Sequence, residues 1–396
     1  MGFSRIRAAG TMIVASALLV AVCVVGGSPA GAATSAPSIS ASSFTLNFSA
    51  MAKLKGLAKS GKGKVAVILP DTVSSARYTE FDAPYLKEAF TKAGLTSSQF
   101  TIQNAQGSDA TQLTDAQSAV SGGASVLVVD PLDSGVGAAI ESYGKSHGVA
   151  VIDYDRLTLG GSRQYYVSFN NVKVGTLIGQ GLESCVTAWK VAKPHVAVMV
   201  GSPTDNNATL FAQGYDAVLA PKFRSGAYVK EAAPAGTWDP PTAETEFQQA
   251  LTAHPSINSV LVPNDENAAP IITYLKTLGT PPDKFPVTGQ DATLVGIQNI
   301  ISGYQCGTVY KPIYEEAQAA AALALYLRAG KPVPASLANG KSTDTVTHVV
   351  VKSVLLQPEY VVPTNVEQTV VKDQFVPAAQ ICAGAYAADC TKYGIK

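Results

Sequence analysis

The sequence predicts an α/β protein made of two doubly wound parallel-sheet lobes joined by a multi-crossing hinge. Short runs of Val, Ile and Leu, such as Val65–Leu69 and Val126–Val129, recur along the chain and are typical of strands buried on both faces. Helical segments separate these runs, and strand–helix alternation favours parallel sheets with right-handed crossovers. A chain of 396 residues is also too long to form one ordinary hydrophobic core, which indicates two domains.

The first lobe is expected to begin at residue 63, after a poorly ordered arm of residues 34–62 that is rich in Ala, Ser and Lys. Gly94 and the Gly122-Gly123 pair follow predicted helices, where glycine commonly ends a helix. The strands of this lobe are predicted at 65–69, 100–104, 126–129 and 149–154, and its helices at 81–93, 110–120 and 136–147.

The second half of the chain repeats this alternation after a crossover at Tyr165–Asn171. A long Ala-rich helix follows Pro312, and because it comes so late we expect it to return to the first lobe. We therefore assign 63–168 and 311–332 to lobe 1, and 169–310 and 333–376 to lobe 2. The second-half helices are predicted at 172–188, 208–219, 242–253, 267–278 and 293–302, and the strands at 196–200, 227–232, 259–262, 286–289, 346–351 and 355–356.

The N-terminus has the layout of a secretory signal peptide over residues 1–33. Arg5 and Arg7 precede an apolar stretch, Met12–Val25, and the small residues of Ser28–Ala33 follow it. A membrane span would need about 20 apolar residues, so a cleaved signal is favoured over an anchor. We expect cleavage after Ala32 or Ala33 and export to the periplasm, the cell envelope or the exterior.

Four cysteines remain after removal of the signal, and an even number in an exported protein points to disulfides. Three connectivities are possible. Cys382 and Cys390 lie in the C-terminal tail of residues 377–396 and could close a small loop, which would leave Cys185 and Cys306 to each other. We expect these two pairs.

Composition and missing motifs exclude several function classes. The 29 basic and 29 acidic residues give a formal net charge of +0, so nothing favours nucleic acid or an anionic membrane surface. The first strand leads into Pro70–Val73 without a glycine-rich turn, and no G-x-S-x-G elbow is present. None of the 4 histidines has zinc-ligand spacing to a cysteine. We expect no cofactor, no metal and no catalytic residue, although a carboxylate pair for glycoside hydrolysis stays open.

Polar residues follow the ends of several predicted strands, where an open α/β sheet binds its ligands. The set comprises Asp155, Arg156, Asp205, Asn206, Asn207, Asn264, Asp265, Gln290 and Asp291. Structural alternatives exist: Asp205 and Asp265 could cap helices, Asn264 and Asp291 could hold turns, Lys311 could be a hinge lysine, and Trp238 could cover the edge of a core. Arg156 directly follows a buried strand and an aspartate, so it needs a partner in the cleft. One polar pocket explains all of these positions together, and we favour it.

The chemistry of this set suits a sugar. A hydroxyl group both donates and accepts hydrogen bonds, so it pairs with a carboxylate and with an Arg, Lys or Asn N–H. The apolar faces of a sugar ring need flat partners. Tyr78 and Trp238 are candidates, the latter in the Gly/Pro-rich loop Gly236–Pro241.

The same segments resemble the xylose-binding proteins of sugar ABC transporters, within the two-lobed periplasmic sugar-binding proteins. The matches span nearly the whole mature chain in the same order. They are Tyr154–Arg156, Val167–Gly175, Gly201–Ala208, Gly289–Ala292 and Thr308–Pro312.

The resemblance implies a monomeric, non-enzymatic protein that binds a monosaccharide, xylose or another aldose, and delivers it to an ABC permease. A sugar-sensing receptor component and an extracellular sugar-active enzyme are the alternatives. The chain departs from the family in Tyr78, which replaces a tryptophan, in the segment 264–270, which lacks the usual glycine, and in the cysteine-bearing tail. Tyr78 and Trp238 would stack on the sugar, and the hydrogen-bonding residues would be Arg77, Asp155, Arg156, Asp205, Asn207, Asn264, Asp291 and Lys311.

Overall fold

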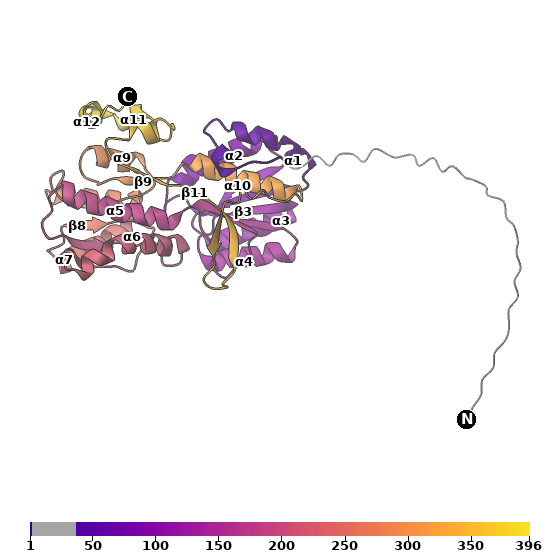
Figure 1. Cartoon of the computed structure of the whole chain (residues 1–396), viewed down its shortest axis with the longest axis horizontal. Helices are drawn as coiled ribbons and strands as arrows, with labels where there is room; N and C mark the ends of the chain where they lie inside the picture. Colours follow the sequence, from indigo (N-terminus) through magenta and orange to yellow (C-terminus); the bar gives the residue numbers. More distant parts are fainter. Residues whose placement is uncertain (2–36) are drawn as a thin grey trace, which may run out of the picture. The chain divides into compact units, whose positions relative to one another are not determined.

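The computed structural model describes Met1 and residues 37–396, which contain two α/β lobes (Figure 1). The predicted signal peptide and its cleavage site, like the first residues of the expected arm, lie outside the described residues. No helix in this described part is long and apolar enough to cross a membrane.

Lobe 1 is built on a seven-stranded sheet with the strand order β10-β11-β5-β4-β3-β1-β2. All neighbouring strands are parallel except β10 and β11. The strands are β1 (Lys64–Leu69), β2 (Phe100–Asn104), β3 (Ala124–Val129), β4 (Ala150–Tyr154), β5 (Tyr165–Phe169), β10 (Gly340–Thr343) and β11 (Val350–Leu356). The helices of this lobe are α2 (Ala83–Lys92), α3 (Asp109–Ser121), α4 (Ser134–Ser146) and α10 (Ile313–Arg328), and a π-helical turn, η3 (Tyr78–Asp82), precedes α2.

Lobe 2 contains a smaller parallel sheet with the order β7-β6-β8. The strand expected at 286–289 is reduced to one bridge between Val287 and Val260, because the Thr288 side chain bonds both backbone groups of Val262. The strands are β6 (His195–Val198), β7 (Val229–Ala232) and β8 (Ser259–Leu261). The helices are α5 (Asn171–Ala188), α6 (Asn206–Arg224), α7 (Pro240–Ala253), α8 (Asp265–Thr277) and α9 (Leu294–Ile301).

The late strands correct our lobe assignment. We placed residues 333–376 in lobe 2, but β11 pairs in parallel with β5 and so extends the sheet of lobe 1. Because β5 is buried almost throughout, its outer edge needs a neighbour, and β11 supplies one with buried Val351 and Val354. Lobe 1 therefore includes β10 and β11.

Three chain segments connect the lobes, and they form a multi-crossing hinge. One runs from β5 into α5, the second from β9 (Thr308–Tyr310) into α10, and the third from β11 into β12 (Glu359–Val361). β9 and β12 form a two-stranded antiparallel sheet beside α5. α10 packs against α2 and the strands of lobe 1, as its late position in the chain led us to expect.

Our prediction of a poorly ordered arm is wrong for residues 37–60. They form η1 (Ala41–Ser43), η2 (Ser49–Leu54) and α1 (Lys55–Ser60), and η2 and α1 pack on α10. Met51 and Leu54 are fully buried there. The spacing of Phe48, Met51 and Leu54 allows one amphipathic turn in this polar segment, and so few apolar side chains are enough to bury one face of a short helix.

Both expected disulfides are present. Cys185 of α5 is joined to Cys306, with a Cα–Cα distance of 5.5 Å, inside lobe 2. Cys382 and Cys390 form the second disulfide, in the tail, with a Cα–Cα distance of 5.6 Å. The last elements are η4 (Glu367–Val371), α11 (Ala378–Ile381), η5 (Gly384–Tyr386) and α12 (Ala387–Tyr393), and α11 and α12 pack on α9.

Leu54→Ala should lower the free energy of unfolding by about 2–5 kcal/mol, because it opens a cavity beneath η2. Exposed Lys53→Ala is the matched control and should change it little. Thermal unfolding of the two variants measures the difference. Equal melting temperatures would contradict the packing of this segment on lobe 1.

Candidate functional site

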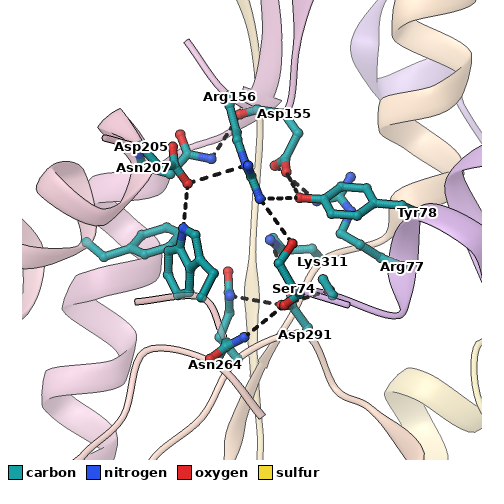
Figure 2. A pocket seen from close by; sticks show the side chains of 14 residues that line it. Ser74, Arg77, Tyr78, Asp155, Arg156, Asp205, Asn207, Asn264, Asp291 and Lys311 are labelled. Atoms are coloured by element: carbon teal, nitrogen blue, oxygen red, sulfur yellow. Dashed lines mark hydrogen bonds and ion pairs between the residues drawn. The ribbon is translucent and has the colours of Figure 1, made fainter. Parts of the chain in front are cut away.

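A polar pocket lies between the lobes, at the carboxyl ends of strands from both (Figure 2). The structure brings all ten predicted site residues to its lining. Ser74, Ser75, Phe211 and Gln290 complete the set, which is otherwise Arg77, Tyr78, Asp155, Arg156, Asp205, Asn207, Trp238, Asn264, Asp291 and Lys311.

Arg77 is held by three buried carboxylates. It donates to both oxygens of Asp82, at 2.8 and 2.9 Å, to Asp155 at 3.0 Å and to Glu316 at 2.5 Å. A guanidinium group has five N–H donors, so these bonds use four of them. One of these bonds fixes the position of the Asp155 carboxylate.

The charge of Asp155 is set by its neighbours. Burial alone would raise the pKa of its carboxyl, but Arg77, Lys311 and Arg156 bring the pKa below its ordinary value. Asp155 also has a left-handed backbone, with φ of 57°. For a residue other than glycine such a conformation costs free energy and is often found at functional sites.

The Tyr78 hydroxyl connects Asp155 and Arg156. It donates to Asp155 Oδ2 at 3.2 Å and accepts from Arg156 Nη2 at 3.0 Å. The guanidinium carbons of Arg77 and Arg156 lie 5.6 and 5.7 Å from the ring centroid. The geometry thus gives Tyr78 a hydrogen-bonding position, where the sequence led us to expect a stacking ring.

Asp205 fulfils both of the roles considered for it. Its Oδ1 accepts from the Asn207 backbone N–H at 2.9 Å and caps α6, while its Oδ2 accepts from Trp238 Nε1 at 3.0 Å. The same Oδ2 lies 3.4 Å from Arg156 Nε, so an ion pair joins the two lobes here. Burial raises the pKa of Asp205, and Arg156 opposes that shift.

Trp238 is positioned by Asp205, by Phe211 and by a glycine. Its ring meets Phe211 edge-on at a centroid distance of 6.4 Å. A Cβ on Gly201 would come within 2.2 Å of the indole, so only glycine lets the tryptophan lie this close to the loop after β6. The side chain remains half-buried at the pocket.

Asn207 ties the lobes together through its amide. Its Nδ2 donates to the Asp155 carbonyl at 3.1 Å, and its Oδ1 accepts from Asn171 Nδ2 at 2.9 Å. Two of its hydrogen-bonding atoms are therefore engaged within the protein.

Asp291 and Lys311 form a buried ion pair at 2.9 Å. Burial would lower the pKa of Lys311, but Asp291 and Asp155 raise it above its ordinary value, so the amine stays charged. Asp291 also has a left-handed backbone, with φ of 93°. Asp155 and Asp291 thus share this unusual conformation on opposite sides of the cleft.

Asn264 caps α8 and faces the other lobe. Its Oδ1 accepts from Asn267 N at 3.3 Å, and its Nδ2 donates to the Ser74 carbonyl at 3.4 Å. Asp265, in contrast, accepts from Thr293 N at 2.9 Å and from Thr308 Oγ1 at 3.0 Å, inside lobe 2. Burial raises its pKa to about 7. Its role is structural.

Four lining residues were not among the predicted site residues. Gln290 belongs to the polar residues at the strand ends and to the segment Gly289–Ala292, but we did not include it in the predicted site. Ser74 and Ser75 follow β1 at the same sheet edge as the predicted set. Phe211 lies in the interior of α6, where an aromatic residue reads as ordinary core.

The pocket combines three cationic and three anionic side chains with one indole. The cations are Arg77, Arg156 and Lys311, and the anions are Asp155, Asp205 and Asp291. Such a site presents donors and acceptors side by side to a neutral, polyhydroxylated molecule. Within the described residues no group of His, Cys, Asp and Glu side chains could hold a metal ion.

A two-lobed α/β fold with a polar cleft between hinged lobes defines a class of solute-binding proteins, and comparison with known proteins gives the family. The periplasmic binding protein domain matches residues 65–332, and this chain belongs to that family.

Relatives cover most of the chain. The D-xylose-binding periplasmic protein of Escherichia coli K12 is 35% identical over 279 residues, 69% of this chain and 80% of that protein. The multiple sugar-binding periplasmic receptor ChvE of Rhizobium radiobacter is 30% identical over 339 residues, which are 81% of this chain and 92% of that protein. The solute-binding protein of a Chloroflexus aurantiacus carbohydrate transporter was solved with D-glucose. It superposes on this protein with a TM-score of 0.70 at 26% identity, and the match covers 80% of this chain and 97% of that one.

Asp291→Asn should destabilise the folded protein by roughly 3 kcal/mol, because it removes the carboxylate that is paired with the buried Lys311 amine. Lys311→Met should also lower the free energy of unfolding, because it removes the amine that is paired with the buried Asp291 carboxylate. The double variant should recover part of the loss, with a coupling free energy of about 1–3 kcal/mol in a double-mutant cycle measured by denaturant unfolding. If the losses of stability in the two single variants simply add up in the double variant, the ion pair contributes no coupling free energy and must be exposed to water.

Proposed function

We propose that this protein is an exported solute-binding protein that closes its two lobes on an aldose monosaccharide and delivers it to an ABC importer. The observation that carries the proposal is the convergence of charged side chains from both lobes, with Arg156 and Asp205 only 3.4 Å apart across the cleft. Each lobe supplies part of the donors and acceptors in the pocket.

Binding would exchange protein–protein hydrogen bonds for protein–sugar ones. Asp155, Asp205 and Asp291 would accept from sugar hydroxyls, while Arg156 and Lys311 would donate to them. Arg77 would act largely through Asp155, and Tyr78 through its hydroxyl. Trp238 would cover an apolar face of the ring. Hinge closure would then leave the buried charges matched.

The choice of sugar rests on the relatives and on Tyr78. Two relatives carry names that specify D-xylose and multiple sugars, and a neighbour of known structure was solved with D-glucose. The polar phenol of Tyr78 offers a hydroxyl contact that a tryptophan lacks. We propose D-xylose as the first ligand to test, with other pentoses and hexoses beside it.

A second candidate is a sugar sensor, because the Rhizobium radiobacter relative is named a receptor. The same closed form could be recognised by a membrane sensor instead of a permease. Sugar uptake into vesicles that contain the cognate permease separates the two: the importer proposal requires uptake that depends on this protein.

Aldoses should raise the melting temperature of the protein. A ligand at a hundred times its Kd stabilises the folded state by about 2.7 kcal/mol. A thermal-shift screen of pentoses and hexoses at millimolar concentration measures this, with the sugar recovered afterwards and analysed. The absence of any shift would refute aldose binding, and a chemically altered sugar would favour an enzyme.

Trp238→Ala should weaken sugar binding by about 1–3 kcal/mol, by analogy with aromatic stacking on nucleic-acid bases. The matched control is Trp189→Ala, since Trp189 lies after α5 and lines a different groove. Titration calorimetry on both variants gives the comparison. Unchanged affinity in Trp238→Ala would assign the indole to packing alone.

A further inference from the structure

Glu266 makes contacts across the cleft that the predicted site did not include. It is the second residue of α8 in lobe 2. Its Oε1 accepts from Ser75 Oγ at 3.0 Å and from the Ala76 backbone N–H at 3.1 Å, both in the loop after β1 in lobe 1. These bonds join the two lobes directly beside Arg77.

We propose that Glu266 is a latch: a positioning residue whose carboxyl group holds the lobes closed over the ligand and makes sugar affinity depend on pH. The inference rests on the proposed sugar-binding function and adds a residue and a control to it. Glu266 acts through its neighbours and needs no contact with the sugar.

The latch is tied to the pocket by two further hydrogen bonds. Glu266 Oε2 accepts from Asn264 Nδ2 at 3.1 Å, and Ser75 Oγ also lies 3.4 Å from Asp291 Oδ2. Opening the cleft would break the bonds to Ser75 and Ala76 and leave a loop amide without its partner. The Glu266 carboxyl thus couples the closure of the lobes to the placement of two pocket side chains.

The charges around Glu266 give the latch a pH dependence. Burial, Asp291 and Asp265 raise the pKa of Glu266 from its ordinary 4.5 to about 8. Asp291 is itself paired with Lys311, and Glu80 and Arg77 line the adjoining pocket from lobe 1. Asp265 keeps its partners inside lobe 2, so opening the cleft leaves its surroundings unchanged.

The direction of the effect follows from this raised pKa. When the cleft opens, water reaches Glu266 and its pKa returns toward the ordinary value, so closure takes up a proton between about pH 4.5 and 8. Sugar affinity should be highest at the acidic end of this window. It should fall by up to tenfold per pH unit as the pH rises, and level off above about pH 8.

The test is the aldose Kd by titration calorimetry from pH 5.5 to 9 for the wild type, Glu266→Gln, Glu266→Ala and Glu80→Gln. Glu266→Gln retains the acceptor and cannot ionise, so at pH 6 it should bind at least as tightly as the wild type and show a flatter pH profile. Glu266→Ala should bind about 10- to 100-fold more weakly than Glu266→Gln at pH 6, because two cross-cleft hydrogen bonds are lost. The control, Glu80→Gln, should follow the wild type.

Identical Kd values and pH profiles in all four proteins would overturn the latch while leaving sugar binding intact. Equal losses in Glu266→Gln and Glu266→Ala at pH 6 would overturn it too. If the wild type binds no aldose, the proposed function fails, and small-angle scattering of the ligand-free proteins tests the latch alone. A larger radius of gyration in Glu266→Ala than in the wild type supports it, and equal radii contradict it.

Discussion

The structure depends on keeping charged groups paired in a cleft from which water is largely excluded. An unpaired buried charge costs several kcal/mol, so each cation in the pocket has a carboxylate partner. Arg77 has Asp155, and Lys311 has Asp291. The members of the pair Arg156–Asp205 come from different lobes, and so do Lys311 and Asp291. Closure of the cleft and satisfaction of its charges are therefore one event, and a sugar that supplies hydroxyl groups to these side chains would take part in it.

The fold serves this requirement by placing strand ends from two sheets opposite each other. Asp155 and Arg156 follow β4, and Asp205 follows the loop after β6. Three chain crossings join the two lobes. The left-handed backbones of Asp155 and Asp291 show that the local geometry of the pocket is maintained at a conformational cost.

Much of this arrangement could be predicted from sequence, because buried strands and the polar residues after them leave a local pattern. Contacts between distant segments leave none. The pairing of β11 with β5 depends on which sheet edge is free, and the burial of Met51 and Leu54 depends on α10 lying nearby. Glu266 escaped notice for the same reason: at the start of a helix a glutamate is ordinary, and only the position of the opposite loop gives it cross-cleft partners.

The central claim is that one ligand is held by both lobes at once. A crystal structure of the protein with a bound aldose tests it most directly. Sugar hydroxyls should lie within hydrogen-bonding distance of Asp155 or Arg156 on one side and of Asp205 or Asp291 on the other, with the indole of Trp238 against the ring. A sugar bound by residues of a single lobe, or outside this cleft, would contradict it.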